Sequence, residues 1–463
     1  GPGQFASPAG VAADAAGNVY VTDYINHRIQ KFRCATIEAL DAANPAWLFD
    51  HQLRNDPQLL ATGGTKVEGV AADGATQLLL RIRTGAAGSV TLNLSDPSAQ
   101  STEGLGTLAP LGGNAGGSSI TMTADASGIA FAVYTAPRDF VRAGVPGDVG
   151  QTERRVQIDG SFTPAGGGEP TAEFTALRIA RPPVVFCHGA FSGPDTWKFA
   201  HVLNDPRWQV TKVNYASDSG CRFARNVPKV RAAITQAREG MRAQKIACAQ
   251  VDYVAHSMGG LLGRVHAGGA SYLSDDNLGR GDFHKFITLD SPHRGLKLAN
   301  VLVSMRDALN DPSTSWARRL IYTNALIDLG KGLNKDYADI IGCSGGAAID
   351  DLSENSEAIL SLGPLDVPTH VHVGTGGSDY LQLASDVADK ANELAPIPYV
   401  RLLWWLTQFG VWAYNDIFYA GQQHDFVVSR SSQQAGLSGP AVSEKGFSDG
   451  VHTNVTSSTQ VGQ

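Results

Sequence analysis

The sequence has little charge and no cluster of positive charge. Charged residues make up 17% of its 463 residues, and the formal net charge at pH 7 is −7. Proteins that bind nucleic acid carry basic patches that neutralise phosphates, and no basic run is present here. The composition therefore argues against a nucleic-acid partner.

Cysteine is also scarce, and long apolar runs are absent. Five cysteines are too few for a disulfide scaffold. Cys187 falls in an expected buried strand, which predicts an inert thiol, whereas Cys221, Cys248 and Cys343 could supply one disulfide at most. The longest strongly apolar, uncharged run, residues 402–415, is shorter than the ~20 residues that a bilayer-spanning helix needs. We therefore expect a soluble chain without a transmembrane segment.

Glycine, by contrast, is abundant. The chain has 52 glycines, concentrated in the first 190 residues and in loops such as GGNAGG and PAGGGEP. Such loops are typical of β-rich structure with many turns, which we expect in the N-terminal part. The chain begins GPGQF, with neither a methionine nor a signal-like apolar core, which predicts a mature or truncated product.

The first 33 residues carry the marks of one repeat. Pro-x-Gly-Val, Gly-Asn-Val-Tyr-Val and the run NHRI follow one another here, and together they resemble an NHL repeat, the blade unit of a β-propeller. No second copy is present, although a single blade cannot bury its own faces. We interpret residues 1–33 as a structural propeller-blade remnant, either the last blade of a propeller or a piece docked on the next domain. A linker is expected at 34–64.

Residues 65–181 contain short runs in which apolar and polar residues alternate, separated by Gly- and Asp-rich turns. Alternation with period two predicts strands that are buried on one face. Seven such strands are typical of an immunoglobulin-like sandwich, which we expect to serve as a spacer or attachment domain. The seven runs are TKVEGVAAD, TQLLLRIRTG, GSVTLNLSD, SSITMTAD, GIAFAVYTA, RRVQIDGSF and TAEFTALRIA.

The pattern changes after Pro182 and Pro183, because strands now alternate with helices. PVVFCHG, WQVTKVNYA, VDYVAHS and KFITLDSPH are predicted strands. Between the second and the third, apolar residues recur at helical spacing from Val227 to Met241. Residues 182–463 are therefore predicted to form an α/β domain with a doubly wound, mostly parallel sheet.

Ser257 lies between the third of these strands and a helix, in the stretch VDYVAHSMGG. A sharp strand-to-helix turn requires small neighbours, and Ala255 and Gly259 flank the serine. This Ala-x-Ser-x-Gly pattern resembles the nucleophile elbow of lipases and esterases of the α/β-hydrolase superfamily. The resemblance implies a catalytic serine, followed along the chain by an acid and then a histidine.

The first strand of the same domain ends in CHGAF, which resembles the His-Gly-x oxyanion loop of lipases. The resemblance implies that the backbone amides of Ala190 and Met258 stabilise the oxyanion. It also places Phe191 beside the substrate.

The resemblance leaves two candidates for each remaining member of the triad. His452, on a loop near the C-terminus, is the expected base, with His424 as the alternative. HDFVVSRSSQQAG resembles the lipase segment that carries the acid after strand seven, which matches Asp425; Asp290, after the fourth predicted strand, is the alternative acid.

Two insertions are expected near 295–363 and 396–421, where lipase-like enzymes place cap or lid helices. The second contains the aromatic residues Trp404, Trp405 and Trp412, which fit either a buried helix or a lid that binds acyl chains. Lipases with an Asp425-type segment bind calcium two residues after the histidine, but Asn454 stands there and Ser431 replaces their disulfide cysteine. We therefore expect no metal site.

These observations predict a serine ester hydrolase, a lipase or carboxylesterase, that acts on lipid-like or apolar acyl esters without a cofactor. A lipid-water or polymer surface is a possible partner, and the accompanying domains suggest secretion. An amidase, thioesterase or glycolipid deacylase would use the same triad. An inactive surface adhesion or scaffold protein is the alternative of a different class.

Overall fold

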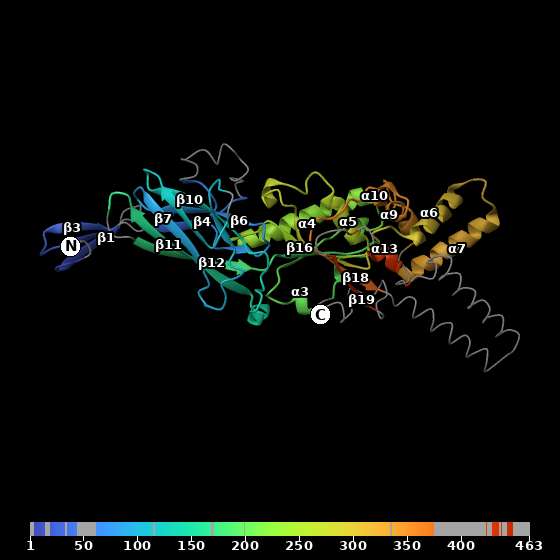
Figure 1. Cartoon of the computed structure of the whole chain (residues 1–463). Helices are drawn as coiled ribbons and strands as arrows, with labels where there is room; N and C mark the ends of the chain where they lie inside the picture. Colours follow the sequence, from blue (N-terminus) through green and yellow to red (C-terminus); the bar gives the residue numbers. More distant parts are fainter. Residues whose placement is uncertain are drawn as a thin grey trace. The chain divides into compact units, whose positions relative to one another are not determined.

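The computed structural model describes residues 4–13, 19–32, 35–43, 62–113, 116–167, 171–198, 200–333, 336–374, 423, 428–434, 437 and 442–447 (Figure 1). The chain divides into two compact units. Unit 1 contains residues 1–182 together with 238–250 and 273–281. Unit 2 contains 183–237, 251–272 and 282–463. Two short segments of unit 1 therefore come from beyond residue 182, where the sequence suggested the start of the last domain.

The first strands of unit 1 form an antiparallel sheet of three, β1 (Pro8–Ala13), β2 (Val19–Asp23) and β3 (Arg28–Phe32). Buried Asp23 closes the turn between β2 and β3. Its carboxylate accepts hydrogen bonds from Asn26 Nδ2 at 2.7 Å and from Arg28 Nε at 3.0 Å. Both donors belong to the NHRI run, so this motif acts by stabilising a tight hairpin.

The rest of unit 1 contains two sheets that share one apolar core. The seven runs predicted as strands all form strands, and buried side chains such as Leu80, Leu92 and Ile158 fill the space between the sheets. One sheet has the order β4 (Thr36–Asp41), β6 (Gln77–Arg83), β10 (Ile129–Thr135), β8 (Thr107–Pro110). The other has the order β15 (Ile246–Ala247), β5 (Gly69–Ala71), β12 (Thr171–Ala180), β11 (Glu153–Pro164), β7 (Gly88–Ser95), β9 (Ser119–Ala124).

Three of these strands were not foreseen. β4 lies in the segment expected as a linker, and β8 lies between two predicted strands. β15 follows α4 (Phe223–Ala243) in the sequence and pairs in parallel with β5. Asp73 holds the chain just after β15, because its Oδ2 accepts from the amides of Ala249 at 3.2 Å and Gln250 at 3.1 Å.

Unit 2 is built on a six-stranded sheet in which every pair of neighbours is parallel. The four strands predicted from the sequence are confirmed, and β18 and β19 follow β17 to complete the sheet at one edge. The order is β14 (Val210–Lys212), β13 (Val184–Cys187), β16 (Val251–His256), β17 (Phe283–Leu289), β18 (Thr369–Gly374), β19 (Val442–Phe447). The predicted α/β architecture is therefore present in unit 2.

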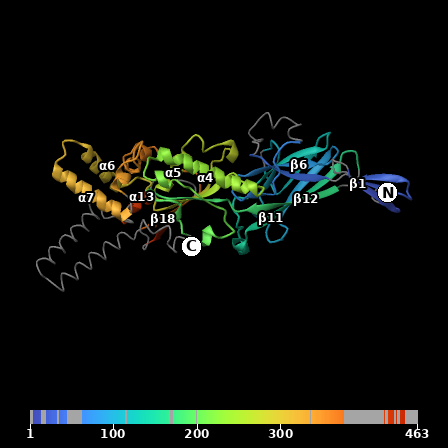
Figure 2. The same ribbon diagram turned by 180° about the vertical axis from the view of Figure 1, so that it is seen from behind.

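Both faces of this sheet are apolar, as a parallel sheet requires. In β13, Val185 and Cys187 pack into one cluster, whereas Val184 and Phe186 pack into another, because successive side chains of a strand point to opposite faces. The first cluster includes residues of α4 and of α5 (Met258–Ala267), which run along the sheet (Figure 2). The predicted apolar face of α4 is thus confirmed.

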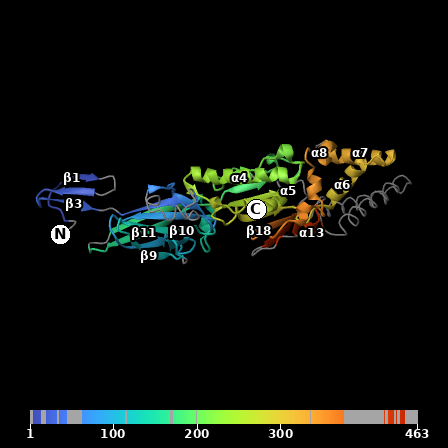
Figure 3. The ribbon, with the colours of Figure 1, turned by 90° about the horizontal axis from the view of Figure 1, so that it is seen from above.

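A helical insertion separates β17 from β18, within the expected range 295–363. Its two longest helices lie side by side (Figure 3). The disulfide between Cys221 and Cys343 joins the insertion to the turn before α4. In the part of the chain that the structure describes, no helix combines the length and apolarity needed to cross a membrane. The helices of the insertion are α6 (Lys297–Asn310), α7 (Trp316–Leu333), α8 (Tyr337–Ile341), α9 (Ala348–Leu352) and α10 (Glu357–Leu360).

Candidate active site

Ser257 forms the turn between β16 and α5. Its backbone is left-handed, with φ 53° and ψ −125°, a conformation that residues other than glycine rarely adopt. The side chain is nearly buried, at 6% exposure, and the backbone amide donates to Leu289 O at 2.9 Å. The strained strand-to-helix turn expected from the sequence is therefore present, at the carboxyl end of a central strand.

Two glycines let the neighbouring chain approach this turn. A Cβ on Gly259 would lie 2.5 Å from Cys187 O and 2.7 Å from His188 O, so only glycine fits there. A Cβ on Gly189 would lie 2.9 Å from Ser257 Cβ and 3.3 Å from Ser257 Oγ. The loop after β13 therefore runs directly against the side chain of the serine.

The residues that follow Gly189 are those that the sequence analysis predicted to form an oxyanion loop. Ala190 and Phe191 are half-buried, and Phe191 has a left-handed backbone with φ 55°. The Phe191 amide donates to Ser219 O at 3.3 Å, which ties the loop to the turn before α4. Met258 is the first residue of α5, and the amides of a first helical turn have no acceptor within the helix. Both predicted amide donors thus belong to segments that adjoin Ser257.

His188 is fully buried within this loop. Its Nδ1 lies 2.9 Å from Gly189 O, and its Nε2 lies 3.4 Å from the amide nitrogen of Tyr215. The imidazole stacks on the Tyr215 ring with the centroids 3.8 Å apart. Burial lowers the pKa of His188 to about 4. The sequence marked this residue only as part of a motif and indicated none of these contacts.

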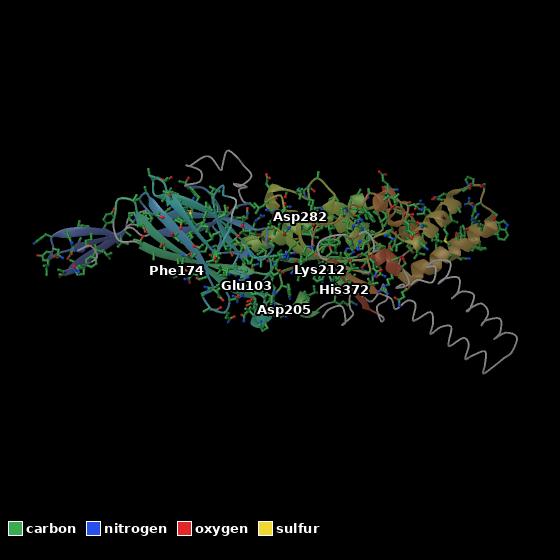
Figure 4. The ribbon with its side chains drawn as sticks, viewed as in Figure 1. Glu103, Phe174, Asp205, Lys212, Asp282 and His372 are labelled. Carbon is green, nitrogen blue, oxygen red and sulfur yellow. A yellow bond between two sulfur atoms is a disulfide. The ribbon has the colours of Figure 1, made fainter. Side chains whose placement is uncertain are left out.

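Asp290, the alternative acid, follows β17 and is fully buried. Its backbone is left-handed, with φ 51°, and its amide donates to the carbonyl of His372 at 3.1 Å (Figure 4 labels His372). Its Oδ1 accepts from the Gly374 amide at 2.6 Å. Because β16, β17 and β18 are parallel neighbours, Ser257, Asp290 and Gly374 all lie at the carboxyl edge of the sheet, where α/β folds bind their ligands.

A short helix, α13 (Arg430–Gln434), is bonded to the same edge. Buried Gln433 accepts from the Gly374 amide at 3.0 Å and donates to Gly374 O at 3.1 Å. Ser432 Oγ donates to Gly295 O at 2.7 Å. These bonds attach the segment that follows Asp425 to the loops after β17 and β18. No sequence signal pointed to Gln433, since its role depends on a tertiary contact.

Three other histidines of unit 2 lie in buried polar pairs. His266 in α5 is 2.7 Å from Asp282, and His284 in β17 is 2.7 Å from Asp252. His293 Nε2 lies 3.2 Å from Thr288 Oγ1, and burial lowers the pKa of His293 to about 3. These contacts agree with structural roles for all three.

The cysteines resolve the open question of the disulfide. Cys221 pairs with Cys343, while Cys187 and Cys248 are buried free thiols. Burial raises the pKa of Cys187 to about 12, which agrees with an inert thiol. The second expected insertion, at 396–421, lies outside the described part of the chain. So do seven residues named in the sequence analysis: Trp404, Trp405, Trp412, His424, Asp425, His452 and Asn454.

Comparison with known proteins gives one family match and several distant structural similarities. A search of curated proteins found no match. Among solved structures, one of the metagenome-derived lipolytic enzymes LipS and LipT is 12% identical, with a TM-score of 0.34 over 60% of this chain and 87% of that one. An α/β fold family hydrolase from Bacillus anthracis is 12% identical, with a TM-score of 0.26 over 64% of this chain and 90% of that one. An epoxide hydrolase from Bacillus megaterium is 12% identical, with a TM-score of 0.27 over 61% and 90%. Residues 5–32 match the NHL repeat family, so the chain carries an NHL repeat near its N-terminus, as the motifs of the first 33 residues predicted.

Proposed function

We propose that the chain is a serine ester hydrolase, a lipase or carboxylesterase that cleaves esters of lipid-like or apolar acyl groups through an acyl-enzyme. The observation that carries the proposal is the turn at Ser257. A left-handed serine follows a central parallel strand and precedes a helix, and the Gly189 loop lies against its side chain. This is the arrangement that a nucleophile elbow of an α/β-hydrolase requires.

In the proposed mechanism, His452 accepts the Ser257 hydroxyl proton while Ser257 Oγ attacks the ester carbonyl carbon. The amides of Ala190 and Met258 donate to the oxyanion of the tetrahedral intermediate. His452 then protonates the leaving alcohol, and a water molecule hydrolyses the acyl-enzyme by the same steps. No cofactor takes part. His424 is the alternative base.

Asp425 is the proposed acid that orients the histidine, with Asp290 as the alternative. The bonds of Gln433 and Ser432 to the carboxyl edge support Asp425, because they attach the segment that begins three residues after it. The burial of Asp290 at the same edge supports the alternative. Its bond from the Gly374 amide also gives it a structural task, which favours Asp425 as the catalytic carboxylate.

Phe191 is the proposed wall of the acyl site, because it follows the oxyanion loop and packs with apolar residues of unit 2. Trp404, Trp405 and Trp412 are proposed to extend this apolar surface as part of a lid, and the helical insertion is proposed as a cap. A lipid-water or polymer surface is the corresponding partner. The two sheets of unit 1 are proposed to be an immunoglobulin-like spacer. The presence of this spacer and of the NHL repeat in the same chain supports an extracellular location.

The test is the rate of p-nitrophenyl ester hydrolysis from acetate to palmitate, for the wild-type chain and for Ser257→Ala. We expect the serine variant to lose at least about 10³-fold in kcat on every ester. An Asp425→Asn variant should lose about 10⁴-fold, because it stabilises the wrong histidine tautomer, whereas Asp290→Asn should lose far less. If Asp290→Asn lost more kcat than Asp425→Asn, the catalytic acid would be Asp290.

The chain-length profile separates a lipase from a short-chain carboxylesterase. If the tryptophans bind acyl chains, replacing Trp404 and Trp405 with alanine lowers the palmitate rate more than the acetate rate. Turnover that survives Ser257→Ala would contradict the proposal. A wild-type chain that neither hydrolyses esters nor reacts with a fluorophosphonate at Ser257 would favour the inactive scaffold.

A further inference from the structure

We propose that His188 is a positioning residue for the oxyanion hole. Its imidazole holds the Gly189 carbonyl, so that the Ala190 amide of the same peptide group faces away from the imidazole and toward the developing oxyanion. The inference rests on the proposed function, because it assigns a task to a side chain that is not itself a member of the triad.

The imidazole has one available orientation. It is fully buried and stacks on the Tyr215 ring with a centroid separation of 3.8 Å and an interplanar angle of 20°. The Tyr215 hydroxyl donates to the backbone carbonyl of His188, so the tyrosine holds both the ring and the backbone of this residue. A ring that is packed on one face and tied at both nitrogens cannot rotate freely.

The hydrogen bonds also assign the tautomer. The backbone nitrogen of Tyr215 can only donate, so Nε2 of His188 accepts this bond and carries no proton. The proton therefore resides on Nδ1, which donates to Gly189 O at 2.9 Å. Because burial lowers the pKa of His188 to about 4, the ring keeps this single-proton form at neutral pH.

Peptide geometry transmits the constraint to Ala190. In a planar trans peptide the C=O and the following N–H point in opposite directions. A bond that fixes the Gly189 carbonyl toward the His188 ring therefore directs the Ala190 N–H away from that ring.

The constraint is needed because the peptide follows a glycine. A flip of this peptide rotates ψ of Gly189 and φ of Ala190. Glycine has no Cβ to restrict its ψ, so without an anchor the Gly189 side of the peptide offers little resistance to this rotation. A flipped peptide would present the Gly189 carbonyl oxygen, instead of the Ala190 N–H, to the negative charge of the intermediate. A side chain at 189 cannot prevent this, since a Cβ there would lie 2.9 Å from Ser257 Cβ.

The expected size of the effect follows from the donor that is lost. Removing one oxyanion-hole donor costs about 10²–10³-fold in kcat. Loss of the anchor leaves the donor in place for part of the time, so we expect a loss of about 10- to 100-fold. The loss should fall on kcat and not on KM, because the oxyanion forms only after the substrate has bound.

The test compares three substitutions in the full chain. His188→Asn places an N–H donor near the position of Nδ1 and should keep kcat within about threefold of wild type. His188→Gln carries the same amide one carbon further out, and His188→Phe keeps the aromatic stack without a donor. Both should lose about 10- to 100-fold in kcat on p-nitrophenyl butyrate, with little change in KM.

A second readout reports on the oxyanion directly. A trifluoromethyl ketone adds to the nucleophilic serine and forms a charged hemiketal, so its inhibition constant should rise in parallel with the kcat loss in the Gln and Phe variants. Full kcat in these two variants would overturn the inference. So would an equal loss in the Asn variant, which would indicate a packing role only.

The proposed function and this inference fail in different ways. A wild-type chain without serine-dependent turnover overturns the proposed function, and it also removes the positioning role proposed for His188. Serine-dependent turnover that is unchanged in the Gln and Phe variants leaves the function intact and overturns His188 alone. If His188→Phe does not fold, the Asn and Gln pair still decides between the outcomes, because both retain a polar side chain.

Discussion

Two buried histidines at the carboxyl edge of unit 2 remain uncharged under ordinary conditions. Burial is the main reason that the pKa of His188 is lowered to about 4 and that of His293 to about 3. The nearby Arg264 guanidinium adds to the effect on His293, and it donates to His293 O at 3.3 Å. A histidine that does not take up a proton near pH 7 is a poor general base. Neither residue therefore competes with the proposed catalytic histidine.

The same pKa values predict a loss of stability in acid. An unfolded histidine titrates near 6.5, so between about pH 6.5 and 4 the unfolded chain binds more protons than the folded one. The free energy of unfolding is therefore undiminished above this window and falls as the pH decreases through it. Each histidine contributes a slope of up to about 1.4 kcal/mol per pH unit.

Urea unfolding at pH 7.5 and at pH 4.5 measures this dependence. His293→Gln removes one titrating group, so its free energy of unfolding should fall less between the two pH values than that of the wild type. The comparison within each protein cancels any constant cost of the substitution. If the free energy of unfolding decreased equally in both proteins, His293 would be protonated at pH 4.5 in the folded state as it is in the unfolded state.

At the level of single residues, steric requirements were readable from the sequence and tertiary contacts were not. The small neighbours of Ser257 indicated a tight turn, and Gly259 does lie where any Cβ would meet the carbonyls of Cys187 and His188. Gln433 gave no signal, because an amide side chain that pairs with the backbone of Gly374 looks like any other glutamine before the chain folds.

Among the elements, the turn before α4 connects the loop after β13 to the helical insertion. Ser219 O accepts from the Phe191 amide, and Gly220 O accepts from the Ala348 amide at 2.7 Å. Cys221 forms a β-bridge with Ala347 and a disulfide with Cys343. One short turn thus makes contacts with both the loop after β13 and the insertion. The sequence could not select the pair among three cysteines, because spacing along a chain does not give distance in the fold.

Removal of the disulfide should loosen the insertion. The bond spans 122 residues of sequence, and cross-links that close long loops contribute about 2–4 kcal/mol. A Cys221→Ser and Cys343→Ser double variant should therefore melt several degrees below the wild type. Dithiothreitol should lower the melting temperature of the wild type to the same extent and leave the double variant unchanged. Identical melting of all forms would contradict a stabilising role.

At the scale of the whole molecule, unit 1 is discontinuous in sequence. β15 pairs in parallel with β5, and Thr76 Oγ1 accepts from the Ala249 amide at 2.8 Å. Lys245 pairs with Glu68 at 2.6 Å and Arg242 with Asp41 at 3.2 Å. The change in periodicity after Pro182 was visible in the sequence, but the return of 238–250 to unit 1 was not, since a strand of two residues has no measurable alternation.

A chain shortened to residues 183–463 should therefore be less ordered than the corresponding part of the whole protein. It contains β15 without β5, and the amides of Ala249 and Gln250 without their acceptors on Asp73 and Thr76. Limited proteolysis should cut the shortened chain between 244 and 250 and spare the full chain. Asp73→Asn in the full chain is the milder control, and the protease should cut this variant at an intermediate rate. Equal resistance of all three would show that unit 1 does not hold this segment.

This topology also sets an order of events during synthesis. β15 lies roughly 175 residues after β5, so at ribosomal rates of about 5–20 residues per second roughly 10–35 s separate the two strands. During that interval the outer edge of β5 is open, and an open edge is a template for pairing with another chain. The nascent protein is therefore most prone to aggregate before its own later residues arrive, and slower initiation on each message should raise the soluble yield.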